Sequence, residues 1–143
     1  DGLRADATAA ADQVRWHPTW GRERMTGMFQ TRPDWCISRQ RAWGVPIPAV
    51  TCTGCGRSHL TPGLVGRAAD VFAQHNADAW YELPIDAFLP EGFRCECGGT
   101  AFEREHDILD VWFDSGSSHE AVLAQRPDLT WPADLYLEGT DQY

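Results

Sequence analysis

Stretches of apolar and polar residues divide the chain into predicted helices and short strands. Residues 4–14 are rich in alanine and predict a helix. Residues 21–31 predict a second helix, because their apolar residues recur at helical spacing. Pro33 is expected to end it, and residues 35–38 have the apolar pattern of a buried strand. The beginning of the chain is therefore predicted to be two helices that lead into a strand.

The middle of the chain carries turn signals and one clear helix start. Thr61 and Pro62 form an N-cap and first-turn pair, which predicts a helix after them. Pro84 and Pro90 bracket a second short turn. Cysteine pairs lie on both sides of these elements, so the middle is predicted to be an insertion with a helix between two cysteine-bearing turns.

The last part of the chain alternates between apolar runs and breaks. Residues 108–113 are mostly apolar, residues 114–116 are expected to break the run, and residues 117–125 predict a serine-capped helix. Residues 134–139 suit a short, buried parallel strand. The pattern as a whole predicts an α/β fold in which a metal-binding insertion separates two pieces of a sheet.

Length and composition place the chain among ordinary globular proteins. It has 143 residues, of which 43% are hydrophobic and 23% charged. No run approaches the roughly 18 apolar residues of a membrane span, and residues 1–20 lack the pattern of a signal peptide. We therefore expect a cytoplasmic protein with no membrane partner.

Charge narrows the possible chemistry further. The net charge of -9 opposes binding to a phosphate backbone by bulk attraction, so any contact with RNA has to be local. All 12 basic residues are arginine. Without lysine, this sequence offers neither a Walker-type phosphate loop nor a Schiff base.

Four of the five cysteines have the spacing of a metal site. Cys52 and Cys55 form a C-x2-C pair, and Cys95 and Cys97 form a C-x-C pair. Glycine follows each pair, where a tight turn needs a positive φ. Four thiolates in a tetrahedron are the closed arrangement of structural zinc, with no position left for substrate. The sequence therefore predicts a Zn2+ ion whose role is to fold the insertion.

Other interpretations of these cysteines remain open. The pairs could form disulfides or redox-active dithiols, although an acidic, cytosol-like chain with an odd fifth cysteine argues against a secreted disulfide framework. The C-x-C pair is short, so His59 could replace one ligand. The fifth cysteine, Cys36, lies in an apolar setting and is predicted to be a buried small hydrophobe.

A polar cluster follows the predicted last strand. Glu138, Asp141 and Gln142 would lie at the carboxyl end of that strand, where open α/β sheets bind ligands. Carboxylate and amide groups suit ribose hydroxyls or an ammonium better than they suit phosphate. The spacing alone leaves a ligand role and a solvated surface both possible.

Three strings together resemble one family. They are R-P-D-W-C-I-S-R-Q-R-A-W-G-V-P-I-P at residues 32–48, D-V-W-F-D-S-G at 110–116 and L-E-G-T-D-Q at 137–142. In this order they resemble the isoleucyl-tRNA synthetases, which are class I aminoacyl-tRNA synthetases, in their bacterial form. The likeness covers nearly the whole chain, in the stretch that leaves the editing insertion and re-enters the catalytic domain.

The resemblance implies a partial Rossmann-type parallel sheet with a zinc-ribbon-like insertion. Residues 1–46 would be the catalytic-domain segment after the editing insertion, 47–105 the zinc-binding insertion and 106–143 the return to the Rossmann core. The implied reaction joins isoleucine and ATP, with Mg2+, to isoleucyl-adenylate and passes the acyl group to tRNA(Ile), in a monomeric parent enzyme. The sequence lacks the family's HIGH and KMSKS strings, so we expect a fragment that is inactive alone.

The resemblance also implies roles for single residues. Trp112 would form one wall of the isoleucine pocket, although a role as a core aromatic stays open. Arg39, Gln40 and Arg41 would either touch the tRNA acceptor end or brace the sheet. No residue is expected to act as a catalytic acid, base or nucleophile. The residues expected to contact the adenylate are Glu138, Gly139, Asp141 and Gln142.

A different class of function stays open beside this one. The chain could be a free-standing zinc-binding module that binds RNA or protein without chemistry. Its net charge of -9 predicts weak binding to RNA.

Overall fold

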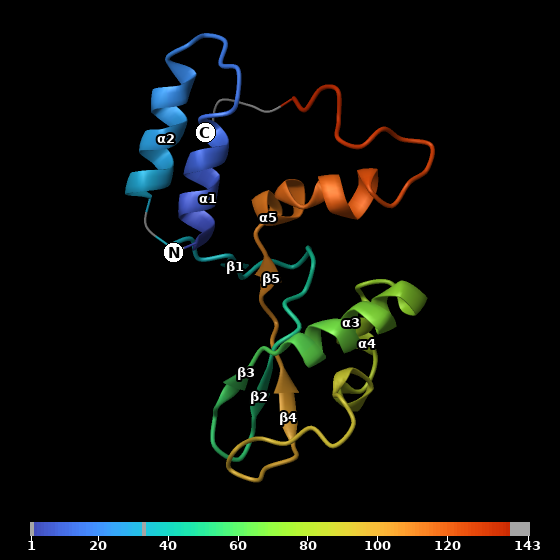
Figure 1. Cartoon of the computed structure of the whole chain (residues 1–143). Coiled ribbons are helices and arrows are strands. Elements are labelled where there is room, and N and C mark those ends of the chain that lie inside the picture. The colour runs from blue at the N-terminus through green and yellow to red at the C-terminus, as the bar shows by residue number, and fades with distance from the viewer. Residues whose placement is uncertain (1, 33, 138–143) are drawn as a thin grey trace. The chain divides into compact units, whose positions relative to one another are not determined.

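The structure is a computed structural model that describes residues 2–32 and 34–137. Contacts divide the chain into two compact units (Figure 1). One unit comprises residues 1–36 and 130–143, and the other comprises residues 37–129. The second unit carries all four cysteines of the predicted metal site.

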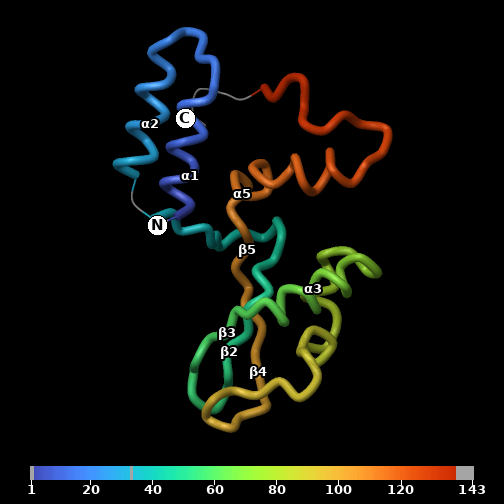
Figure 2. Tube along the Cα trace, in the orientation of Figure 1, coloured from blue at the N-terminus to red at the C-terminus, as the bar shows by residue number. Residues whose placement is uncertain are grey.

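The first unit is built on a helical hairpin. Helix α1 (Gly2–Ala11) packs beside α2 (Gly21–Thr31), and Figure 2 shows the two traces side by side. In the connection, the Trp16 indole donates to the carbonyl of Ala11 at 2.9 Å. Residues 130–137 of this unit contain neither a helix nor a strand. Both helices were predicted from the sequence and are confirmed.

An antiparallel three-stranded sheet forms the lower part of the second unit in Figure 1. Its order is β3 (Ser58–His59), β2 (Val50–Cys52) and β4 (Phe102–Arg104). Between β3 and β4 the chain forms α3 (Pro62–His75), α4 (Ala79–Glu82) and the 3-10 helix η1 (Ile85–Phe88).

Helix α3 begins as its sequence predicts. The Thr61 hydroxyl accepts a hydrogen bond from the Leu64 backbone N–H at 3.2 Å, and Pro62 occupies the first turn. Leu64, Ala68 and Val71 form its buried face. A capped, amphipathic helix of this kind is stabilised mainly by the core that it covers.

Two aromatic residues dominate that core. Trp80 and Phe88 are completely buried, with their ring centroids 4.8 Å apart in an edge-on arrangement. The Trp80 indole donates to the carbonyl of Glu105 at 2.8 Å, which satisfies its polar N–H group. The Arg104 guanidinium donates to the carbonyl oxygens of Trp80 and Leu83, so α4 is held against β4 by hydrogen bonds as well as by packing.

An antiparallel ribbon leads from this sheet to a second, smaller one. Leu109 N–H donates to the Val45 carbonyl at 2.8 Å, and Ile47 N–H donates to the Asp107 carbonyl at 3.1 Å. Glu105 N–H donates to the Ala49 carbonyl at 2.9 Å, and the β2–β4 pairing follows directly after it. Residues 45–52 and 102–109 therefore run against each other over their whole length.

The smaller sheet pairs β1 (Ser38–Arg39) with β5 (Ile108–Leu109), again antiparallel. Pro46 forms a further bridge to Ile108. Gly44 lies so close to Ile108 that a Cβ there would collide with the isoleucine side chain, and its φ is 154°. Glycine is therefore needed at the bend before the ribbon.

The chain after β5 corrects one prediction. The sequence predicted that the apolar run of residues 108–110 continues through residue 113 and breaks at residues 114–116. Instead, helix α5 (Val111–Gly116) begins directly after Asp110. The Asp110 carboxylate accepts from the Trp112 backbone N–H at 2.9 Å and caps the helix. The π-helical turn η2 (His119–Leu123) follows, where a helix was predicted.

The predicted parallel sheet is not found among the described residues. All strand pairs there are antiparallel, because the ribbon brings the chain back beside itself after the insertion. Residues 134–137 are not a strand, and Leu135 and Leu137 are exposed. The described chain is instead mixed helix with small antiparallel sheets, while the boundaries 1–46, 47–105 and 106–143 stay a prediction.

Cys36 also differs from its prediction. It is exposed, because residues 34–37 do not join a sheet and β1 begins only at Ser38.

The helices within the described ranges are all too short or too polar to cross a membrane.

We expect Phe88→Ala to lower the free energy of unfolding of the second unit by about 3–5 kcal/mol, because it leaves a cavity beside Trp80. The measurement is chemical denaturation followed by tryptophan fluorescence. Leu60→Ala is the matched control, since Leu60 is 59% exposed, and should change the value by less than about 0.5 kcal/mol. Equal losses in both variants would contradict the core described above.

Candidate functional site

The four predicted ligands converge at the end of the three-stranded sheet. Cys52 ends β2, Cys55 lies in the turn that follows, and Cys95 and Cys97 lie in the loop before β4. Their four sulfurs all lie within 4.8 Å of one another. The Sγ atoms of Cys52 and Cys97 are 3.7 Å apart, and those of Cys55 and Cys95 are 3.5 Å apart.

Backbone hydrogen bonds shape the turn after β2, here called the first knuckle (residues 52–57). Gly56 N–H donates to the Cys52 carbonyl at 2.8 Å, and Cys52 N–H donates to the Arg57 carbonyl at 2.9 Å. Gly56 has a φ of 72°, which a side chain would strain. The glycine after Cys55 is therefore part of the site's architecture.

The second knuckle (residues 95–99) repeats this design. Gly98 N–H donates to the Cys95 carbonyl at 2.8 Å, Cys95 N–H donates to the Gly99 carbonyl at 2.9 Å, and Gly98 has a φ of 86°. A Cβ on Gly99 would lie 2.9 Å from the Cys52 sulfur and 3.3 Å from the Cys97 sulfur. Only glycine leaves room for the two sulfurs at this position.

The thiol geometry fits a tetrahedral metal ion. Zn–S bonds of about 2.3 Å place the four sulfurs of a tetrahedron about 3.8 Å apart. The observed contacts of 3.5 and 3.7 Å are close to that value and far from the roughly 2.05 Å of a disulfide. The four cysteines can therefore hold a metal ion in a closed site.

His59 is not part of this group of ligands. Its ring packs edge-on against Phe93 and Phe102, at centroid distances of 5.7 and 5.8 Å. Its Nε2 atom is buried without a hydrogen-bond partner. The short C-x-C pair supplies both of its sulfurs, so the cluster does not need the histidine.

The pKa values of two thiols diverge because the sulfurs are crowded. Burial opposes ionisation of Cys52, but backbone N–H groups of the first knuckle and the neighbouring thiols lower its pKa to about 7. A backbone N–H group favours the Cys55 thiolate, but the thiols of Cys95 and Cys97, burial and Cys52 raise its pKa to about 12. Four thiolates repel one another without a cation, so a metal ion has to displace protons when it binds.

The predicted substrate residues lie mostly beyond the described chain. Glu138, Gly139, Asp141 and Gln142 fall outside the described residues. Trp112 is in the first turn of α5, where the residue is 40% exposed. Trp112 is therefore accessible to a ligand.

Arg39 in β1 and Gln40 directly after it hold this segment against the β5 segment. Arg39 forms an ion pair with Asp110, and the Gln40 amide donates to the Asp107 carboxylate at 2.7 Å. Both contacts link the β1 segment to the β5 segment, which was one of the two roles considered for Arg39 and Gln40. Asp110 is 8% exposed, so its charge is largely removed from water and needs this partner.

Sequence reasoning missed Asp110 as a positioning residue. An aspartate directly before a helix is an N-cap signal, but the apolar run around it masked that signal. Its charge also acts on Asp114, whose pKa is raised by burial and by the negative charge of Asp110. Asp110 thus fixes the start of the helix that carries Trp112.

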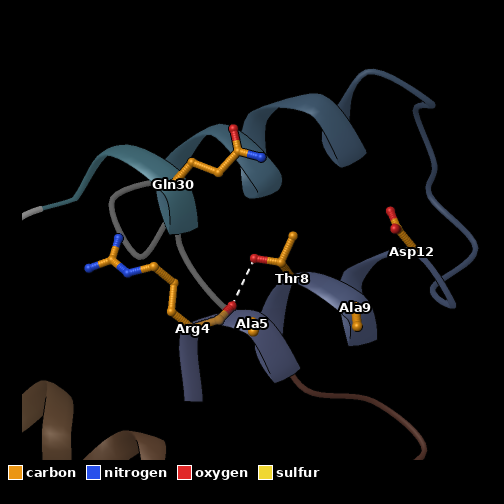
Figure 3. A pocket seen from close by; sticks show the side chains of 6 residues that line it. All are labelled: Arg4, Ala5, Thr8, Ala9, Asp12 and Gln30. Carbon is orange, nitrogen blue, oxygen red and sulfur yellow. Dashed lines mark hydrogen bonds between the residues drawn. The ribbon is translucent and has the colours of Figure 1, made fainter. Parts of the chain in front are cut away.

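A shallow hollow of about 520 Å³ lies on the helical hairpin of the first unit (Figure 3). Arg4 already donates to the carbonyl oxygens of Phe29 and Arg32. Thr8 donates to the Arg4 carbonyl at 2.8 Å, as the dashed line in Figure 3 shows. Arg4 thus links α1 to α2 and Thr8 bonds within α1, so both groups are already used and the hollow indicates no ligand.

Comparisons with known proteins point to one family. Residues 1–143 match the family model described as tRNA synthetases class I (I, L, M and V). The chain is 53% identical over 143 residues to the isoleucine–tRNA ligase of Caldanaerobacter subterraneus subsp. tengcongensis. It is 52% identical to that of Natranaerobius thermophilus and 50% identical to that of Desulfitobacterium hafniense. Each match covers 100% of this chain but only 15%, 15% and 16% of the respective relative. The resemblance found in the sequence strings is confirmed.

We expect Cys52→Ser to lower the affinity for zinc by roughly 100-fold. Metal binding free energies of about 10–16 kcal/mol over four ligands imply about 3 kcal/mol for each thiolate. Competition with a chromogenic chelator measures the affinity. Cys36→Ser is the control, because Cys36 lies outside the cluster, and its affinity should be unchanged. An equal affinity in Cys52→Ser and the unaltered chain would contradict the four-thiol site.

Metal affinity should fall as the pH is lowered. At pH 7 the Cys55 thiol, with its raised pKa, still holds its proton in the metal-free chain, and Cys52 is only partly ionised. Each proton displaced by the metal then contributes about a tenfold loss of affinity per pH unit of acidification. Competition with a chromogenic chelator at pH 8, 7 and 6 measures this slope. An affinity that does not change with pH would mean that the ligands are not thiols.

Proposed function

Because the chain belongs to the class I tRNA synthetases of the isoleucine, leucine, methionine and valine group, we propose that it forms part of the catalytic region of an isoleucine-specific enzyme. That enzyme activates isoleucine with ATP and transfers the acyl group to tRNA(Ile). The observation that carries the proposal is 50–53% identity to isoleucine–tRNA ligases along the entire chain. The chain spans about one sixth of the length of these relatives.

The partners follow from this reaction. Isoleucine, ATP with Mg2+ and tRNA(Ile) are the proposed substrates, and the proposed enzyme is a cytoplasmic monomer. The acidic surface supports local rather than bulk contact with tRNA, since the net charge is -9.

The proposed substrate contacts use carboxylate, amide and indole groups. Glu138, with Gly139 and Asp141 beside it, would accept hydrogen bonds from ribose hydroxyls, and Gln142 would receive the substrate ammonium together with a carboxylate. Trp112 would form a flat apolar wall for the isoleucine side chain. Such a wall distinguishes one methylene by only about 1–3 kcal/mol, which explains why enzymes of this kind need editing.

The positioning of Trp112 rests on the bracing contacts. Asp110 caps α5 and is itself held by Arg39 of the paired strand. The backbone N–H of Asp110 also donates to the Ile37 carbonyl at 2.7 Å. Three contacts on one buried residue fix the direction in which α5 leaves the sheet, and with it the place of the indole.

We propose that the metal is a structural Zn2+ ion held by Cys52, Cys55, Cys95 and Cys97. When bound, the ion supplies a fourfold cross-link and no reactive position, because four sulfurs complete its tetrahedron. The chain's own contribution is to bring the two knuckles together through the β2–β4 pairing, which sets Cys52 opposite Phe102. With the ion bound, the loop before β4 would be held against the turn after β2.

The test is amino-acid-dependent exchange of pyrophosphate into ATP by a full-length synthetase that contains this sequence. Isoleucine should support exchange, while leucine and methionine should not. Glu138→Ala should lower kcat/KM for exchange by about 100-fold or more, as expected when a charge-assisted hydrogen bond in the transition state is lost. Glu120→Ala is the matched control on the exposed turn η2 and should keep full activity.

Two outcomes would overturn the proposal. Exchange that depends on valine or leucine in place of isoleucine would reassign the substrate. Unchanged kcat/KM in Glu138→Ala would remove this glutamate from the site.

A further inference from the structure

We propose that the four cysteines are also an oxidation site with a defined pairing. A two-electron oxidant such as hydrogen peroxide would convert them into the disulfides Cys52–Cys97 and Cys55–Cys95 and release the metal ion. Each disulfide would join the first knuckle to the second. Oxidation would thus exchange the metal cross-link for a covalent one between the same two segments.

The pairing follows from which sulfurs touch. The two short contacts, 3.7 Å for Cys52 with Cys97 and 3.5 Å for Cys55 with Cys95, each join one knuckle to the other. A sulfur pair at this separation has to close by less than about 2 Å to reach disulfide bonding distance. These two contacts therefore favour links between the knuckles.

Burial divides the four cysteine residues into two kinds. Cys55 and Cys97 are exposed, whereas Cys52 and Cys95 are buried. Each of the two contacts joins one exposed cysteine with one buried cysteine. This arrangement suits disulfide formation by an oxidant, because the exposed cysteine can be oxidised first and its buried partner can then react with it.

The chemistry balances for each pair. The exposed thiolate attacks one peroxide oxygen, the O–O bond breaks, and the sulfur becomes a sulfenic acid while the other oxygen leaves as hydroxide and takes up a proton. The buried thiolate then attacks the sulfenic sulfur, and the S–O bond breaks with loss of a second hydroxide, which is also protonated to water. For both pairs, four thiolates, two peroxides and four protons give two disulfides and four waters.

The surrounding backbone favours links between knuckles over links within them. Each turn is closed by its own hydrogen bonds, from Gly56 to the Cys52 carbonyl and from Gly98 to the Cys95 carbonyl. The Cys52 and Cys97 sulfurs meet over Gly99, which has no Cβ to separate them. Links between knuckles keep these turns and the β2–β4 register, whereas a disulfide within the C-x-C pair would have to distort the second knuckle.

The direct experiment treats the zinc-loaded chain with hydrogen peroxide. Released zinc is measured with a chromogenic chelator, and the intact mass should fall by about 4 Da relative to the metal-free thiol form, two hydrogens for each disulfide. Peptide mapping without reduction should recover the links Cys52–Cys97 and Cys55–Cys95. Cys36, which lies in the other unit, is the internal control and should appear in neither link.

Two variants test the pairing separately. Cys55→Ser should form only the Cys52–Cys97 link on peroxide treatment, and Cys97→Ser should form only Cys55–Cys95. Either variant could lose its fold. The peptide mapping of the unaltered chain therefore decides the proposal by itself, whether or not that chain retains zinc. Thiol reductant with added zinc should reverse the oxidation and restore the bound ion.

The contrary results are equally distinct. Links of Cys52 with Cys55 or of Cys95 with Cys97 would overturn the pairing. Sulfinic or sulfonic acids on Cys55 and Cys97 without cross-links would show that the buried sulfurs cannot reach them, which would overturn the proposal as a whole.

Discussion

The antiparallel ribbon formed by residues 45–52 and 102–109 is the constraint on which the second unit depends. It joins segments that are far apart in the sequence and therefore carries the full entropic cost of closing the insertion between them. Its backbone contacts run from Val45 with Leu109 to the pairing of Cys52 with Phe102. The cysteine cluster lies at one end of the ribbon, and the start of α5 lies at the other.

At one end, the ribbon has only a small core to stabilise it. Trp80, Phe88 and Leu64 fill the space over the sheet, and β3 contributes only two residues. Cys52 and Cys95 of the two knuckles belong to this core, whereas Cys55 and Cys97 are exposed at its edge. A metal ion bound by the four thiolates would therefore add a cross-link where the core ends.

The sequence predicted those features that depend on local chemistry. Thr61 with Pro62 defined the start of α3, and the spacing of the cysteine pairs, each followed by glycine, defined the cluster that the structure brings together. Asp110 and the sheet topology were not predictable in the same way. The cap on α5 lies inside an apolar run, and the direction of pairing between β1 and β5 is set by how the insertion returns the chain.

The resemblance to the synthetase family did not remedy this, because a family string names residues and not their contacts. R-Q-R was compatible with both tRNA binding and bracing. Only the positions of Asp107 and Asp110 across the β1–β5 pairing show that Arg39 and Gln40 brace the chain. The parallel strand expected at residues 134–139 likewise needs neighbours, and residues 134–137 have no strand partner within the described chain.

The register of the ribbon links its two ends. A strand has a side-chain period of two, so a slip by one residue would turn every side chain of the ribbon to the opposite face. The cysteine cluster fixes the register at one end, while the Arg39–Asp110 ion pair and the close approach of Gly44 to Ile108 fix it at the other. A cross-link at the knuckles therefore supports the register that sets the start of α5, although it lies at the far end of the ribbon. We propose that a metal ion at the knuckles would act on the rest of the unit through this register, since a closed four-thiol site leaves no position for a substrate.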